Sequence, residues 1–155
     1  MDFELNYSEL IEVIKDEIAR EASQAYTSEG ESLYESLRWV SRDDERSQRM
    51  MGEVLSGIKE QCNRFICCAD FEADTTTDMY GTLTFDLVAT QRRIAGREGS
   101  VSVLLRSLVT DMFLQKYFLG KNNTDLASKY NEMAVADIKS LSNLLYTKMP
   151  PTYPV

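Results

Sequence analysis

Residues 100–120, SVSVLLRSLVTDMFLQKYFLG, decide the fold, because apolar side chains recur on more than one side of the helix that they predict. One side carries Val101, Leu104, Leu105, Leu108, Met112 and Leu119, and another carries Val109, Phe113 and Tyr117. A helix that is apolar on several sides must be covered on several sides. The segment therefore predicts a central helix, which Gly120 ends as a C-terminal cap residue.

A second helix is expected to return along the first, after a turn at KNNTD, residues 121–125. Asn123 or Thr124 is its expected N-cap. Its apolar residues recur in a single stripe: Leu126, Tyr130, Met133, Ala134, Ile138, Leu141 and Leu145. Residues 101–147 are therefore predicted to form an antiparallel helical hairpin.

The first helix of the chain is predicted to begin within NYSEL, residues 6–10. Asn6 or Ser8 is its expected N-cap, and Glu9 holds the capping-box position relative to Asn6. Its apolar stripe comprises Leu10, Ile11, Ile14, Ile18, Ala22 and Ala25. Acidic residues are expected to occupy the opposite face: Glu9, Glu12, Asp16, Glu17 and Glu21.

Two more helices are predicted before residue 70. A short one covers residues 31–40, and a longer one begins at SRDDE with Ser41 or Asp43 as its N-cap. The apolar stripe of the longer helix continues to Ile66 and places Cys62 in the interior. Together with the hairpin, these helices predict a mainly α fold, a four- to five-helix bundle.

One segment, TLTFDLV at residues 82–88, shows the alternation of a half-buried strand. A strand needs a partner for its backbone hydrogen bonds. Either QRRIAG at residues 91–96 folds back as the second arm of a hairpin, or a strand of another copy pairs with it. We therefore expect a small β-hairpin insertion at about residues 80–97, before the penultimate helix.

The preceding segment, DFEADTTTDMYG at residues 70–81, is predicted to be a loop. Its spaced acids suggest a calcium loop of the EF-hand type, which requires glycine at position 6 and glutamate at position 12. Thr75 and Gly81 stand at those positions. A solvated acidic loop is the favoured interpretation.

A single helical domain is expected over residues 1–147, since the 155-residue chain is long enough for one core. The remaining residues, 148–155, read KMPPTYPV and are expected to form an extended Pro-rich tail, because proline cannot continue a helix. The tail and the arginine-rich segment supply the candidate assembly contacts: Arg92, Arg93, Arg97, Pro150, Pro151 and Tyr153.

Histidine is absent from the chain. Ser-His and Cys-His nucleophile pairs therefore cannot be built, and the commonest general base and metal ligand are missing. Cys62, Cys67 and Cys68 include no CxxC pair, and a reducing compartment is the simpler interpretation of three cysteines. We expect no catalytic residues, no metal or other cofactor, and no small-molecule substrate.

The N-terminal residues MDFELNYSEL carry acids where a secretory signal would carry basic residues. No apolar run approaches the roughly 18 residues that cross a bilayer. The sequence therefore predicts no membrane association, and a protein made and used in a cytoplasm or packaged from one.

Charge is distributed unevenly along this acidic chain, whose net charge is −8. Residues 1–74 hold 18 Asp or Glu and 8 Lys or Arg. Residues 75–155 hold 7 Asp or Glu and 9 Lys or Arg. An acidic face of one copy can therefore meet a basic face of the next, which favours head-to-tail self-association.

The layout resembles the small helical head–tail connector or tail-completion proteins of tailed bacteriophages, in the versions found in phages and prophages of Bacteroidales-type hosts. Three passages carry the resemblance: ESLYESLRWVSRDDERSQRMMGEVL, TLTFDLV and FLGKNNTDLASKYNEMAVADIKSLSNLLYTKMPP. It implies a non-enzymatic virion structural protein, assembled in the host cytoplasm, whose copies form a ring between the portal and the tail proteins. DNA would pass through this ring without specific binding.

Three other functions are compatible with the sequence. A cytoplasmic regulatory or adaptor bundle would bind a partner protein through the arginine segment or the tail. DNA binding is suggested by Arg92, Arg93 and Arg97, but a pI near 4.6 argues against it. A carboxylate enzyme would use residues 43–45 or 70–78, yet neighbouring acids on a helix do not face each other.

Overall fold

The computed structural model describes residues 1–73, 81–88 and 96–146. In chain order its elements are β1 (Asp2–Asn6), α1 (Tyr7–Gln24), α2 (Tyr34–Leu37), α3 (Ser41–Gln61), β2 (Ile66–Ala73), β3 (Gly81–Leu87), α5 (Glu98–Gly120) and α6 (Thr124–Tyr146). The described part is mainly helical, with a small antiparallel sheet completed before α5, and this confirms the predicted fold class. No described helix is long and apolar enough to cross a membrane.

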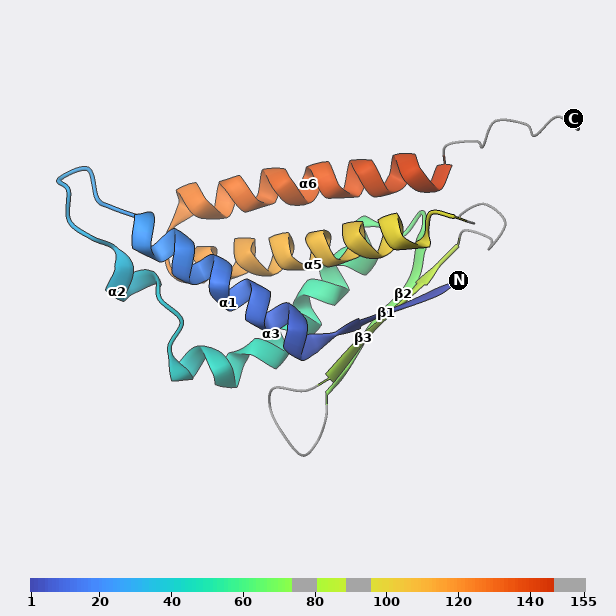
Figure 1. Cartoon of the computed structure of the whole chain (residues 1–155), viewed down its shortest axis with the longest axis horizontal. Helices are drawn as coiled ribbons and strands as arrows, with labels where there is room; N and C mark the ends of the chain where they lie inside the picture. The colour runs from blue at the N-terminus through green and yellow to red at the C-terminus, as the bar shows by residue number, and fades with distance from the viewer. Residues whose placement is uncertain (74–80, 89–95, 147–155) are drawn as a thin grey trace, which may run out of the picture.

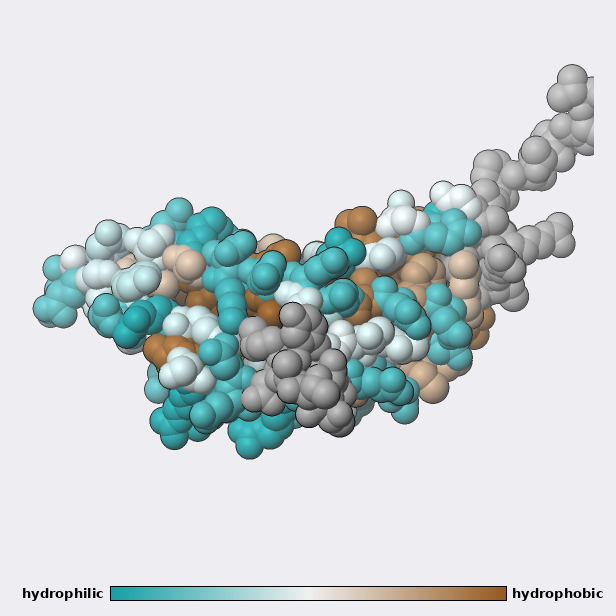
Figure 2. All heavy atoms as spheres, turned by 60° about the horizontal axis from the view of Figure 1, so that its bottom comes forward, coloured by the Kyte–Doolittle hydropathy of each residue, from teal (hydrophilic) through white to brown (hydrophobic). Residues whose placement is uncertain are grey.

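Helix α5 lies at the centre, between α6 on one side and α1, α3 and the sheet on the other (Figure 1). Its buried residues cover several sides of the helix, as predicted: Val101, Leu105, Leu108, Val109, Asp111, Met112, Phe113, Leu114, Tyr117 and Phe118. Leu119 differs from the prediction because it is 55% exposed. The surface on the side shown in Figure 2 is mostly hydrophilic, which is consistent with burial of the apolar residues around α5.

The turn between α5 and α6 differs in detail from the prediction. Gly120 is the last residue of α5, and the residue with the left-handed backbone is Asn122, whose φ is 60°. Asn123 caps α6, because its side-chain oxygen accepts a hydrogen bond of 3.0 Å from the backbone N–H of Leu126. The predicted antiparallel hairpin is confirmed.

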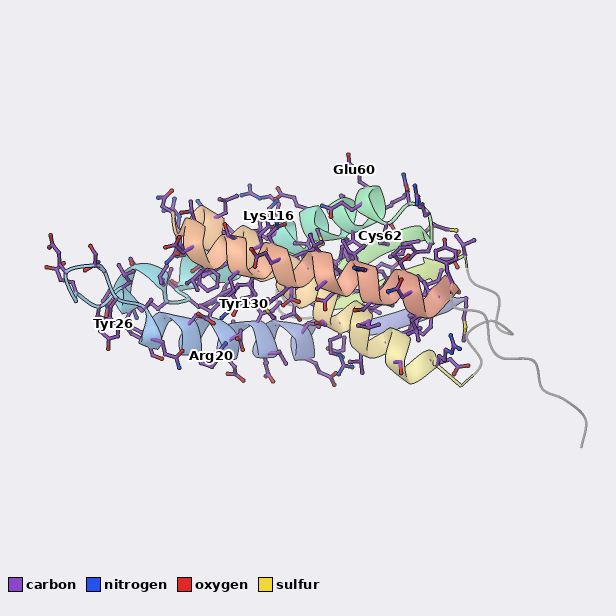
Figure 3. All side chains as sticks on the ribbon, turned by 90° about the horizontal axis from the view of Figure 1, so that it is seen from above. Arg20, Tyr26, Glu60, Cys62, Lys116 and Tyr130 are labelled. Carbon is purple, nitrogen blue, oxygen red and sulfur yellow. The ribbon has the colours of Figure 1, made fainter. Side chains whose placement is uncertain are left out.

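Helix α1 begins as predicted, with Asn6 accepting a 3.3 Å hydrogen bond from the backbone N–H of Glu9. Its acidic residues do not all face solvent, however. Tyr130 of α6 donates to Glu17 at 3.0 Å or Glu21 at 3.1 Å, and Glu21 is only 6% exposed. Figure 3 shows Tyr130 between α6 and α1. Part of the predicted solvated face is therefore a polar contact between helices.

The prediction was wrong for the ends of α2 and α3. Helix α2 is a single turn, and the segment predicted as helix at 31–40 is otherwise irregular. Helix α3 ends at Gln61, and Cys62 is buried at its C-terminal end. The predicted apolar stripe included Ile66, which is indeed buried. Ile66 is, however, the first residue of β2 and not part of the helix. The buried residues of α3 and the first buried residue of β2 follow each other at helical spacing, so the sequence pattern did not show where the helix ends.

The sheet has the order β1–β3–β2, with both neighbouring pairs antiparallel. Sequence analysis missed β1, and it assigned residues 70–73 to a loop, although they belong to β2. Because β3 is the central strand, both of its edges are paired within the chain, so the alternative in which a strand of another copy pairs with it was wrong. The other proposed partner, residues 91–96, lies outside the described residues except for Gly96.

A junction of polar contacts fixes the start of α3 against the end of α5. The Asp43 carboxylate accepts a 2.9 Å hydrogen bond from the N–H of Val40, the N-cap of α3, so Asp43 caps α3 from its first turn. The same carboxylate lies 3.2 Å from Lys121 Nζ. The buried Tyr117 hydroxyl donates to the Leu37 carbonyl at 2.8 Å. These contacts link α2, α3 and the end of α5.

Replacing Asp43 by Ala removes the side-chain acceptor for Val40 and the partner of Lys121. We expect the free energy of unfolding, measured by urea denaturation, to fall by about 1–3 kcal/mol. Glu45→Ala is the control, since Glu45 is an exposed acid in the same turn, and it should change stability by no more than about 0.5 kcal/mol. Equal effects of the two substitutions would contradict this role of Asp43.

Candidate functional site

A cationic groove of about 550 Å³ lies between α3 and α5. Five basic side chains line it, namely Arg42, Arg46 and Arg49 from α3, Lys116 from α5 and Lys121, the C-cap residue of α5. The three arginines stand at i, i+4 and i+7, a spacing that places them on one face of the helix. All three are exposed. Figure 3 shows Lys116 on the side of α5 that faces α3.

The two acids of the groove each hold one of its lysines. Lys121 pairs with Asp43 at 3.2 Å, and Lys116 pairs with Glu53 at 2.5 Å. The hydrogen bond from Lys116 lowers the pKa of Glu53 below its ordinary value. Within the described residues, the three arginines form no ion pair, so the groove presents a net positive charge.

Apolar surface accompanies the positive charges of the groove. Leu119 is 55% exposed there, and Met50 is half-buried. The ammonium group of Lys121 lies 5.3 Å from the ring centre of Tyr117, and the same ring stacks with Trp39 at 5.6 Å. A groove that offers both cations and apolar contacts suits an acidic protein surface better than a bare phosphate chain.

The solvent-facing side of the sheet is strongly acidic. Residues on one side of β1 and β3 are buried, and the opposite side of the sheet carries five carboxylates, which we call the acidic sheet face: Asp2, Glu4, Asp70, Glu72 and Asp86. The register places Asp2 directly opposite Asp86 and places Thr84 between Glu4 and Asp70. The N-terminal amine lies 3.3 Å from Asp86, but the face itself carries no Lys or Arg.

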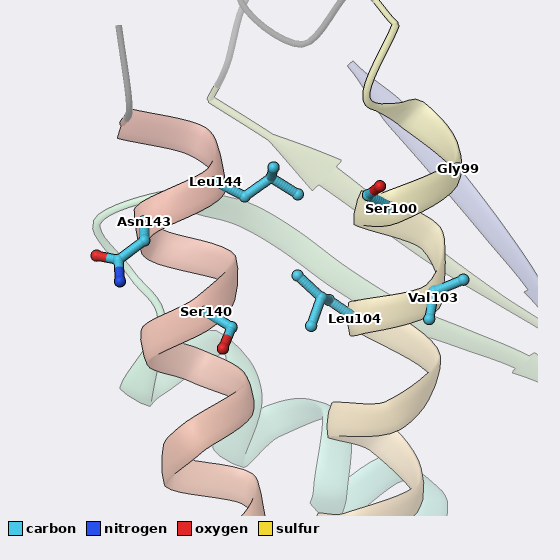
Figure 4. A pocket seen from close by; sticks show the side chains of 7 residues that line it. All are labelled: Gly99, Ser100, Val103, Leu104, Ser140, Asn143 and Leu144. Atoms are coloured by element: carbon cyan, nitrogen blue, oxygen red, sulfur yellow. The ribbon is translucent and has the colours of Figure 1, made fainter.

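A third surface is an apolar groove of about 610 Å³ between the start of α5 and the end of α6 (Figure 4). Leu104 and Leu144 face each other across it, and the exposed Val103 lies at its edge (Figure 4). Small and polar residues complete its lining: Gly99, Ser100, Ser140 and Asn143.

Of the predicted assembly contacts, the structure places Arg97 alone. Arg97 is the N-cap residue of α5, and its guanidinium donates a 3.0 Å hydrogen bond to the Leu144 carbonyl of α6. This contact joins the two helices of the hairpin. The other candidates lie outside the described residues: Arg92, Arg93, Pro150, Pro151 and Tyr153.

Sequence analysis missed the arginines of α3, although SRDDERSQR at residues 41–49 contained the signal. Three arginines at i, i+4 and i+7 predict a basic stripe on a helix. The stripe was overlooked because only the net charge of residues 1–74 was considered, and the many acids of that half make it negative. The structure separates the two signs. Asp43 is buried, and Asp44 binds the Trp39 indole at 2.7 Å and Lys15 at 3.2 Å.

The described residues include no group of three or more Cys, Asp or Glu that could hold a metal ion. Cys62 is buried, and burial raises the pKa of its thiol to about 11. The acids proposed for a carboxylate enzyme at residues 43–44 serve in helix capping and ion pairing. Residues 74–78 of the second proposed acidic cluster lie outside the described part of the chain.

A carboxyl pair, the buried Asp111 and the half-buried Asp137, links α5 to α6. Ser107 Oγ lies 3.0 Å from Asp137 Oδ2 and 3.4 Å from Asp111 Oδ2, so the serine bridges the two carboxyl groups. Asp111 is 4% exposed. Burial, followed by the contact with Asp137, raises the pKa of Asp111 well above its ordinary value. The pair therefore retains a proton that an exposed aspartate would have lost.

This pair gives stability a definite pH dependence. An unfolded aspartate loses its proton near pH 4, whereas the native pair keeps one to higher pH. The free energy of unfolding should therefore fall from about pH 4 up to the raised pKa of the pair, by at most about 1.4 kcal/mol per pH unit. Asp111→Asn keeps a neutral side chain and should flatten this decline in urea denaturation at several pH values. Asp125→Asn, at an exposed site, should leave the slope unchanged, and an unaltered slope in Asp111→Asn would contradict the assignment.

No protein-family model, curated protein sequence or solved structure matches this chain. Its function must therefore be inferred from the layout of its elements and from its surfaces. Among those surfaces, the cationic groove and the acidic sheet face bear most directly on a binding partner, because they carry opposite charges on separate parts of one molecule.

Proposed function

We propose that this chain is a non-enzymatic virion structural protein, a head–tail connector subunit that assembles into a ring at the portal–tail junction of a tailed bacteriophage. The observation that carries the proposal is the separation of opposite charges into the cationic groove and the acidic sheet face. A surface that is complementary to a different surface of the same molecule favours head-to-tail contacts, and such contacts close into rings or extend into filaments.

The expected order of helices, sheet and helical hairpin supports the same proposal, because it is the layout on which the resemblance to connector proteins rests. The portal and tail proteins would be the other partners, and the virion, assembled in the host cytoplasm, would be the location. The net charge of −8 suits a channel, since acidic surface repels phosphate and lets DNA pass without being held.

The proposal predicts an oligomer that depends on salt. Molar mass measured by light scattering after size exclusion should exceed that of a dimer at low salt and fall at about 1 M salt, where the Debye length is about 3 Å. Charge attraction between exposed surfaces is screened under the second condition. A strict monomer under both conditions would contradict self-assembly of the chain.

A cytoplasmic regulatory or adaptor bundle is the second candidate, and the apolar groove between α5 and α6 favours it. Val103 is 64% exposed beside this groove, which is a feature of surfaces that receive a partner's apolar side chain. The adaptor would be favoured by a monomer whose Val103→Asp variant loses a defined protein partner, while Val135→Asp, at a site that is 56% exposed, does not.

A further inference from the structure

We infer that the cationic groove of one copy binds the acidic sheet face of the next copy. This inference rests on the proposed ring and specifies its interface. The groove contains five basic side chains and two acids, and both acids already hold a lysine of the same molecule. None of the described carboxylates forms an ion pair with the three arginines. These arginines can therefore bind carboxylates of another copy.

The acidic sheet face brings like charges together in the isolated chain, and of its five carboxylates Asp86 pairs with the N-terminal amine. Asp2 and Asp86 are direct cross-strand neighbours, and like charges in that arrangement repel each other. Glu4 and Asp70 flank Thr84 from the two outer strands, and Glu72 lies one cross-strand row further along. Cations supplied by a neighbouring molecule would relieve this repulsion, whereas a second acidic surface would increase it.

The spacing of the charges is similar on the two surfaces. Along α3, a rise of about 1.5 Å per residue separates Arg42 from Arg46 by about 6 Å and Arg46 from Arg49 by about 4.5 Å. On the sheet, alternate residues of a strand such as Asp70 and Glu72 are about 6.6 Å apart, and neighbouring strands are about 4.8 Å apart. The similar spacing allows more than one arginine–carboxylate pair to form across the same contact.

The position of the two surfaces makes the contact head-to-tail. Figure 1 shows the first turns of α3 and the last turns of α5 toward one end of the long axis, and the sheet toward the other. A copy that offers its groove to one neighbour therefore keeps its sheet face available for another. The exposed Leu119 within the groove favours a protein surface over the phosphates of DNA.

Charge reversal tests the contact in both directions. The groove variant carries Arg42→Glu with Arg46→Glu, and the sheet variant carries Asp70→Lys with Glu72→Lys. All four residues are exposed, so circular dichroism should show both variants folded. Each variant alone should need at least about tenfold more protein for half-assembly at low salt, because attractive pairs become repulsive.

Mixing the two variants gives the decisive result. In an equimolar mixture, the unaltered sheet of the groove variant faces the basic groove of the sheet variant, and the reversed surfaces also have opposite signs. Light scattering should therefore show recovery of the wild-type mass in the mixture. Lys59→Glu with Lys139→Glu makes the same change in net charge as the groove variant at exposed sites outside the groove, and it should assemble like the wild type.

The outcomes separate this interface from the ring itself. Assembly of the wild type that is unaffected by the groove variant, but lost when Arg92 and Arg93 are replaced by Glu, would overturn the interface and leave the ring proposal standing. A wild-type chain that stays monomeric would overturn both. Binding of a short fluorescent DNA duplex by the wild type, lost in the groove variant, would assign the groove to nucleic acid and overturn the inference.

Discussion

The burial of α5 is the constraint on which the rest of the structure depends. Because this helix is apolar on several sides, it is stable only when other elements cover each of them. Helix α6 covers one side, and α1, α3 and the sheet cover the others. The need to enclose α5 thus explains why a helical chain contains a sheet: Phe3 and Leu5 of β1 and Phe85 of β3 belong to the same buried core as α5.

Covering α5 also brings charged groups into contact between elements. Asp43 at the start of α3, Asp111 in α5 and Glu21 in α1 are all buried. Asp43 and Glu21 have hydrogen-bond partners outside their own helices, and Ser107 bridges Asp111 to Asp137 of α6. A buried carboxyl group without such partners would be costly. Part of the acidic content of this chain is therefore structural, and five of the other acids form the acidic sheet face.

The helices and their caps were predictable from the sequence because their signals are local. Asn6 and Asn123 cap α1 and α6 through hydrogen bonds that span three residues. The partners of β3 were not predictable, because β1 lies about eighty residues away and its pattern at residues 2–6 is too short to identify a strand. The groove was missed for a related reason: α3 supplies its arginines, but only the packing of α5 beside α3 adds Lys116 and Lys121 and buries Asp43.

We propose that two oppositely charged surfaces of one chain drive a closed, head-to-tail assembly. Electron microscopy of the wild-type protein at low salt would reveal how the copies are related as well as how many there are. Closed rings are expected, in which one contact repeats around the axis. Two-fold dimers that bury the same surface on both copies, or no particle larger than a dimer, would contradict it.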